Sequence, residues 1–393
     1  MPALRAVVAR VGVACVVSVS CACSSPPPRE PTPVGTLADL AVVATVDGHL
    51  APPDAVVAGT GSHIQLHAVV TVTQPDGRRR RFADDQAVSL LRTGPTPAEG
   101  WDPERSGAIA FEWVAVQAAL HSYDNTKPGH QITYLEREID TPAQPPRSWL
   151  DTLLGHPRQP TDRAAAGWTL DVPRAAGTTR YRLRAAYGSG LTQAPAHGSA
   201  TGASSRVYRV TRHDGDDLAG WMTAWEQLPY VYGSMPDQVE EFVGADCADL
   251  VVGACHRLGS RDIPYTYTQA LLQWGDVVFD GYVSYGGAWF DRQKRPVQRL
   301  HVPRNTLIIW PTGGHVAVLT RDFDLEAGAP LGVIQAHPNV GGIAVGDTYY
   351  QMFRKKPDPG WKLDAVQLVR LRVPGSALSR THSPPPALPA PLY

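Results

Sequence analysis

One cysteine, Cys247, stands where the sequence predicts the first turn of a helix. Asp246 is a good N-cap residue, and the apolar run LVVGAC that follows ends at Leu258-Gly259, where glycine can adopt a left-handed cap conformation. At a helix start, unpaired backbone N–H groups and the positive end of the helix dipole favour a thiolate, which is the nucleophilic form of cysteine. Asp249 opposes this effect because it places a negative charge nearby, so the thiol needs a second group to activate it.

Polar residues that could activate this thiol lie downstream. His315 follows a Gly-Gly turn and opens the predicted strand HVAVLTR, so its ring can reach over the end of the sheet towards the helix start. On the predicted strand LGVIQAH, Gln335 and His337 share one face because strand side chains alternate. Gln335 could orient His315 through its amide oxygen, and His337, slightly favoured by its chemistry, could do so through a ring nitrogen. A cysteine activated by an oriented histidine is the arrangement of covalent acyl transfer.

Taken together, these stretches resemble a known family. PYVYG, followed by ADCADLV, LIIWPTGGHVAVL and VIQAHP, is similar to the NlpC-type papain-like cysteine peptidases, which are bacterial cell-wall hydrolases. The resemblance covers roughly residues 215–373 and departs from the family where Ala248 and Asp249 replace the usual Ser-Gly. It implies an α+β papain-like fold with an antiparallel sheet. It also implies cleavage of peptidoglycan stem peptides near D-glutamyl linkages, without a cofactor.

The resemblance further implies roles for individual side chains. The third catalytic residue of the family stands immediately before the alanine, which selects Gln335, so Gln335 and His337 both remain candidates. Tyr230 of the PYVYG motif would lie close to the nucleophile and hold substrate, with a packed aromatic as the equal alternative. We assign Tyr232 to the core. Asp246 would bind a free amine of the substrate as well as cap the helix.

The N-terminus is typical of an export signal. Residues 1–23 combine Arg5 and Arg10 with the apolar run VGVACVVSVS, which is too short to span a membrane. Cysteines after small residues resemble a bacterial lipoprotein signal, with Cys21 the favoured acylation site and Cys23 the alternative. An ordinary secretory signal is the competing interpretation. The lipoprotein interpretation implies a protein of the cell envelope, held through its N-terminal lipid at the outer membrane or in the periplasm.

Composition and cysteine spacing limit the number of domains, the kinds of partner and the possible disulfides. The 393 residues, 43% of them hydrophobic, allow about two domains plus tails, and a net charge of -1 gives no basic bias towards nucleic acid. Cys247 and Cys255 are eight residues apart on one predicted helix, or about 12 Å of rise, which is too far for a disulfide. We therefore predict a reactive role for Cys247 and a core role for Cys255. The sequence leaves the oligomeric state open.

After the signal the chain divides into four parts. Residues 24–37 form a Pro-rich linker, and residues 374–393 form a tail predicted to be disordered. Residues 38–212 show strand-like alternation, which predicts a mostly β, antiparallel sandwich, with an immunoglobulin-like arrangement as one candidate. Residues 213–373 hold the predicted hydrolase, beginning with a helix over 214–228 whose tryptophans face the core.

Three other features have both a functional and a plainer interpretation. Arg78–Arg81 could bind anionic polymer, but its place after the QPDG turn favours a solvated strand edge. His63 and His67 would lie on the outward face of the strand HIQLH, and without a nearby cysteine or carboxylate cluster they predict no metal site. The aromatic residues of 274–290 favour a cleft wall over a small cluster under a loop.

The expected function is therefore cysteine endopeptidase activity on the cell wall. Two alternatives from other classes stay open. A catalytically silent wall-binding lipoprotein is suggested only by Ala248 and Asp249, and the intact Cys247 and His315 argue against it. A papain-like amidase or acyltransferase acting on lipid or protein would need an apolar channel lined by residues 270–300.

Overall fold

The structure is a computed structural model that describes residues 35–92, 97–103, 108–118, 120–126, 136–139, 167–187, 190–193, 207–284, 287–328, 331–338, 342–346 and 363–373. The predicted signal with Cys21 and Cys23, nearly all of the Pro-rich linker and the predicted tail lie outside these residues. Within the described stretches, no helix has the length and apolar character needed to cross a membrane.

The first sheet is built from the beginning of the chain. Its strands run in the order β2-β1-β4-β5-β6, and β10 pairs with β4. They are β1 (Thr36–Val46), β2 (His49–Leu50), β4 (Ile64–Thr73), β5 (Arg79–Ala83), β6 (Glu99–Gly100) and β10 (Thr169–Asp171). The predicted QPDG turn joins β4 to β5, and Gly77 there has a φ of +79°, which suits glycine. Arg78 and the two arginines after it are exposed, as expected for a solvated edge.

The second sheet has the order β3-β13-β11-β7-β9, with β12 paired to β11. Its strands are β3 (Ala55–Gly59), β7 (Ile109–Ala118), β9 (Glu136–Ile139), β11 (Gly177–Tyr187), β12 (Gly190–Gln193) and β13 (Tyr208–His213). Most pairings in both sheets are antiparallel. However, β3 runs parallel to β13 and β6 runs parallel to β5, so the purely antiparallel arrangement predicted from the sequence is wrong on these two edges.

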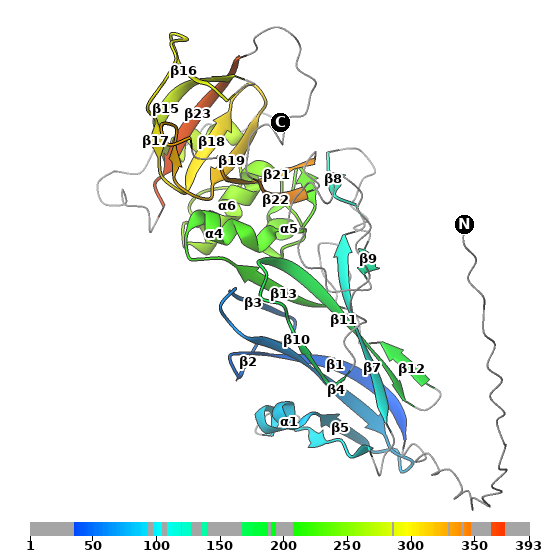
Figure 1. Ribbon diagram of the computed structural model, residues 1–393. Helices are drawn as coiled ribbons and strands as arrows, with labels where there is room; N and C mark the ends of the chain where they lie inside the picture. The colour runs from blue at the N-terminus through cyan, green and yellow to red at the C-terminus, as the bar shows by residue number, and fades with distance from the viewer. Residues whose placement is uncertain are drawn as a thin grey trace, which may run out of the picture.

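A shared apolar core lies between these two sheets, which make up the N-terminal half (Figure 1). The first sheet contributes Leu40 and Leu66, and the second contributes Trp113, Leu183 and Val210. These side chains lie at alternate positions along their strands, so each sheet presents one apolar face to the other. Burial of this interface is the main stabilising contribution available to the half.

The outer face of the first sheet is covered as well, which corrects the expectation for His67. A short helix, α1 (Asp85–Leu91), packs there, and His67 is fully buried rather than outward. Its Nδ1 lies 2.8 Å from a carboxylate oxygen of Asp84, and its Nε2 lies 3.3 Å from the Thr45 hydroxyl. Asp84 also caps α1 by accepting from the N–H of Ala87. Alternation alone correctly places His67 on the outer face of the first sheet, but the sequence does not show that a helix covers this face.

The C-terminal half is organised around a seven-stranded sheet of order β16-β15-β23-β18-β19-β21-β22. Its strands are β15 (Gly275–Ser284), β16 (Trp289–Asp291), β18 (Thr306–Trp310), β19 (His315–Leu319), β21 (Val333–His337), β22 (Gly342–Gly346) and β23 (Leu363–Leu371). A small separate pair is formed by β17 (His301–Val302) and β20 (Phe323–Asp324). Neighbouring strands of the large sheet are antiparallel throughout the pairings described.

Helical segments lie on one face of this sheet. They are α4 (Leu218–Met222), the 3₁₀ turn η1 (Thr223–Trp225), α5 (Pro236–Glu240), α6 (Cys247–Arg257) and the 3₁₀ segment η2 (Thr268–Trp274). The helix predicted over 214–228 is shorter than expected, because Asp217 caps α4 and the preceding residues stay outside it. Trp225 is fully buried, as predicted.

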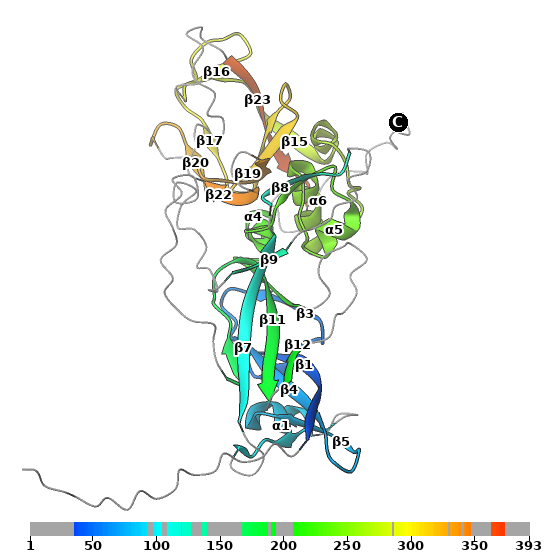
Figure 2. The same cartoon turned by 90° about the vertical axis from the view of Figure 1, so that its right-hand side faces the viewer.

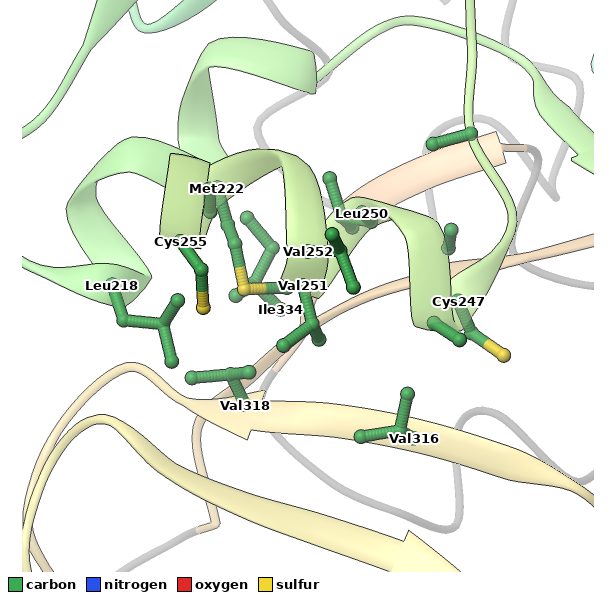
Figure 3. Close-up of a cluster of buried hydrophobic side chains, with 14 of the residues drawn as sticks. Leu218, Met222, Cys247, Leu250, Val251, Val252, Cys255, Val316, Val318 and Ile334 are labelled. Carbon is green, nitrogen blue, oxygen red and sulfur yellow. The ribbon is translucent and has the colours of Figure 1, made fainter. Parts of the chain in front are cut away.

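Two cores flank the large sheet, and one of them fixes the position of α6. One core packs α6 against Val316, Val318 and Ile334, and Figure 3 shows Val316 and Val318 beneath the helix. The other core lies on the opposite face. Gly253 allows α6 to pack closely, because a Cβ at this position would lie 2.6 Å from Val239. Cys255 is buried in the first core, which confirms its predicted place.

The two halves meet beside α6. Strand β8 (Ser122–Asp124) leaves the N-terminal sheets and pairs in parallel with β14 (Tyr230–Tyr232), among the elements of the C-terminal half (Figures 1 and 2). Nearby, the Arg180 guanidinium donates to the carbonyl oxygen of Phe242 at 2.6 Å. Both contacts involve the chain segment that leads into the cysteine helix.

Candidate active site

The start of α6 agrees with the sequence prediction. Asp246 is the N-cap, and its carboxylate accepts from the backbone N–H groups of Ala248 and Asp249 at 3.0 and 2.9 Å. Cys247 is therefore the first residue of the helix, and Gly259 follows its end with a φ of +94°. The capping residues favour this helix start locally, and the apolar face of α6 holds it against the sheet.

The Cys247 sulfur faces the beginning of β19. Sγ lies 3.8 Å from the carbonyl oxygen of Gly314 and 3.8 Å from the hydroxyl oxygen of Thr268, and the backbone N–H of Val316 is near enough to lower the pKa of the thiol. Gly314 and Val316 are the two neighbours of His315 in the chain. The sulfur thus contacts the backbone on both sides of His315. Thr268 was not singled out by sequence reasoning, because nothing local marks a threonine 21 residues away as a contact of the thiol.

The imidazole of His315 is held by an amide. Its Nε2 lies 2.7 Å from Oε1 of Gln335, and since this oxygen can only accept, Nε2 carries the proton and Nδ1 is the basic nitrogen. His337 meets the same ring edge to face, with centroids 5.0 Å apart, and Trp310 stacks on it at 5.5 Å. Of the two candidates left open by the sequence, Gln335 is the one whose hydrogen bond to His315 is described.

The alternation of side chains along β19 decides on which face of the sheet the imidazole lies relative to the thiol. Val316 and Val318 face α6, whereas Ala317 and Leu319 belong to the core on the opposite face. His315, two residues before Ala317, shares that opposite face at the first position of β19. A proton that moves from the sulfur to the ring must therefore pass around the end of the strand, at the turn before His315.

Both partners are neutral at rest. Burial and the Asp246 carboxylate raise the pKa of the Cys247 thiol to about 11, although backbone N–H groups and Thr268 act in the opposite direction. The helix N-terminus contributes about 0.3–1 kcal/mol, less than the roughly 1.4 kcal/mol that moves a pKa by one, so the thiol stays protonated near pH 7. Burial lowers the pKa of His315 to about 4, despite the hydrogen bond to Gln335.

Two carboxyl groups flank the thiol. Burial and the neighbouring Asp246 raise the pKa of Asp249 to about 7, against the effect of a hydrogen bond of 2.6 Å from the Ser234 hydroxyl. Burial also raises the pKa of Asp246. Asp249 is therefore partly protonated at neutral pH, because two neighbouring buried carboxylates do not ionise together easily. Ser234 connects them, since it also accepts from the N–H of Asp246 at 3.0 Å.

Of the aromatic residues singled out in the sequence, Tyr232 and Trp289 are placed differently from expectation. Tyr230 is half-buried against the core, and burial together with the nearby Cys247 and Asp246 charges raises the pKa of its hydroxyl. Tyr232 was predicted to be core but is 53% exposed, because β14 pairs with β8 at a surface edge. Trp289, expected in a cleft wall, packs in the core on the far face of the sheet.

Within the described residues, no group of three or more histidine, cysteine, aspartate or glutamate side chains is arranged to hold a metal ion. The site as described consists of the Cys247 thiol, the His315–Gln335 pair and the two carboxyl groups at the helix start. No family model matches this chain, and neither does any curated protein or solved structure.

Proposed function

We propose that this protein is a cysteine hydrolase that cleaves amide bonds in peptidoglycan stem peptides. The observation that carries the proposal is the position of the Cys247 sulfur. It lies at the N-terminus of α6, against the backbone on both sides of His315, and the His315 ring is bonded to Gln335. A thiol, a basic nitrogen and a group that fixes its tautomer are the parts that covalent acyl transfer requires.

The neutral resting state favours general-base activation. As the sulfur attacks the substrate carbonyl, an S–C bond forms, the carbonyl π electrons move to oxygen, and Nδ1 of His315 takes the thiol proton. Gln335 stabilises the imidazolium through the Nε2 hydrogen bond. Collapse of the tetrahedral intermediate breaks the C–N bond, and the imidazolium protonates the leaving amine. Water then hydrolyses the thioester with His315 as the base.

The start of α6 supplies the groups that would stabilise the oxyanion and bind the substrate. The backbone N–H of Cys247 is one of the helix N–H groups without an intrahelical partner, so it is the natural donor to the oxyanion. Asp246 and the partly ionised Asp249 carry negative charge that would attract a free amine of the substrate, and half-buried Tyr230 would pack against it. A peptide with an unblocked N-terminus fits this distribution of charge.

The substrate class and location come from the resemblance to NlpC-type peptidases. Stem peptides cleaved near D-glutamyl linkages are the expected substrate, and no cofactor is required. We further propose that acylation at Cys21, or at Cys23, anchors the protein in the cell envelope.

A second candidate function is catalytically silent binding of wall peptides. It is favoured by the high pKa of the Cys247 thiol and by the place of His315 on the sheet face opposite α6. In this case the carboxyl pair and Tyr230 would still bind an amine, but the thiol would not react.

One experiment separates the two. Purified muropeptides are incubated with the wild type, Cys247→Ala and Cys255→Ala, and the products are identified by mass. The hydrolase proposal predicts new peptide fragments with the wild type and Cys255→Ala, and none with Cys247→Ala, since only Cys247 lies at the helix start. Uncut muropeptides that co-sediment with folded wild-type protein would overturn the hydrolase proposal in favour of silent binding.

A further inference from the structure

The N-terminal half contributes directly to the surroundings of Cys247. Strand β8 pairs in parallel with β14, where Ser122 lies opposite Tyr230 and Asp124 lies opposite Tyr232. The N–H of Tyr230 donates to the carbonyl of His121 at 2.9 Å. The motif that precedes the cysteine helix is therefore held by a strand from the other half of the chain.

Asn125, which follows β8, makes the most specific of these contacts. Its backbone N–H donates to the carbonyl of Tyr232 at 3.0 Å. Its side-chain amide donates to the carbonyl of Gly233 and to Oε1 of Gln238, each at 2.9 Å. Gln238 is buried, and the same oxygen accepts from the N–H of Met235 at 2.9 Å. Asn125 thus ties together the two ends of the turn between β14 and α5.

This turn carries the groups that hold the two carboxyls beside the thiol. The backbone N–H of Gly233 acts to lower the pKa of the Asp246 carboxyl, and the Ser234 hydroxyl donates to Asp249 and accepts from the N–H of Asp246. Gly233 has a φ of +65°, and a Cβ there would lie 3.0 Å from the Thr126 methyl group, so the turn fits closely against the segment after β8. The contacts run without a break from Asn125 to the residues on either side of Cys247.

We propose that Asn125 is a positioning residue of the candidate active site, through which the N-terminal half fixes the Gly233–Ser234 turn and the carboxyl pair around Cys247. The kinetic part of this inference, which is the expected loss of kcat, rests on the proposed function. It assigns the N-terminal half a role in setting the site, beyond any role in binding the wall. The site is then complete only when both halves are present in their folded arrangement.

Two substitutions at Asn125 test this inference in the full-length protein. Asn125→Ala removes both side-chain donors. Asn125→Asp keeps the shape but places a carboxylate oxygen against the Gly233 carbonyl and the Gln238 amide oxygen. Gln117→Ala is the matched control, because Gln117 also reaches across the halves, with Nε2 3.3 Å from Oε1 of Gln227, but away from the cysteine helix.

The first measurement is the pH dependence of Cys247 alkylation by iodoacetamide, which needs no substrate. Loosening the turn admits water to the helix start, so in both Asn125 variants the midpoint should move from about 11 towards the ordinary thiol value of about 8.5. The second is peptide hydrolysis, where kcat should fall at least about tenfold with a smaller change in KM. Gln117→Ala should leave both unchanged.

A wild-type alkylation profile in both Asn125 variants would overturn the inference, as would a loss of kcat no larger than the loss of folded protein. Failure of the wild type to hydrolyse any stem peptide would instead overturn the proposed function. The alkylation profile still decides the role of Asn125 in that case.

Discussion

Replacing Gln335 by alanine removes the amide oxygen that accepts from Nε2 of His315 at 2.7 Å. His315 is buried, so its N–H loses its partner in a place where water enters with difficulty. Leaving a buried donor unsatisfied costs about 1–3 kcal/mol. If that cost falls on the transition state, where the imidazole is charged, kcat should drop by about 5- to 150-fold. His337→Ala should have a smaller effect, because the described contact of His337 is edge-to-face ring packing.

Steady-state hydrolysis of a stem peptide measures this effect. The loss should lie mainly in kcat, because an orienting group acts on the transition state. Gln335→Glu tests the direction in which the pKa of His315 moves. Burial lowers the pKa of His315 to about 4, and a carboxylate at this position would stabilise the imidazolium and raise that pKa. The acid limb of the pH profile should therefore move to higher pH. Wild-type kcat in Gln335→Ala, with a large loss in His337→Ala, would refute the assignment of Gln335.

Other predictions concern stability and anchoring. Cys255→Ala should lower the free energy of unfolding by about 1–2 kcal/mol in a urea titration, since it removes a buried group from the core. Asp84→Ala should cost about 2–4 kcal/mol, because it removes the cap of α1 and leaves His67 buried without its carboxylate; an unchanged urea midpoint would contradict this. Burial acts to raise the pKa of Asp84, but its hydrogen bonds outweigh burial and hold the pKa below the usual value. This stabilisation is therefore present above about pH 4 and is lost as the pH falls through the folded pKa, which urea titrations between about pH 6 and about pH 3 would show. An alkyne fatty acid should label the wild type and not Cys21→Ser; label that persists would move the site to Cys23, and a wild type without label would remove the lipoprotein proposal.

Local signals in the sequence predicted the parts of the site that depend on local structure. Asp246 caps α6 because its side chain reaches N–H groups two and three residues ahead, and that spacing is visible in the sequence. The strands that begin at His315 and contain Gln335 follow from alternation and from the glycines before them. The place of Cys255 two turns along the same helix follows from the helical repeat.

The remaining features depend on contacts between distant segments. Thr268 reaches the sulfur from a 3₁₀ segment, and Asn125 reaches the turn after β14 from the other half of the chain. The error at His67 arose because a helix covers the outer face of its sheet, and the error at Tyr232 arose because its strand pairs at a surface edge. Periodicity shows which side chains share a face, but not what packs against that face.

The parallel pairing of β8 with β14 also bears on how the chain folds. The paired residues Ser122 and Tyr230 are about a hundred positions apart, and closing a loop of that length costs roughly 4 kcal/mol of chain entropy by its logarithmic term alone. Helix α6, by contrast, forms from neighbouring residues and can appear early. We therefore expect the cysteine helix to form early in refolding, and the docked β8 strand to form late, together with the other long-range pairings such as β3 with β13. A chain stopped before β8 docks would hold the cysteine helix, but its nucleophile would still lack the neighbours that set its chemistry.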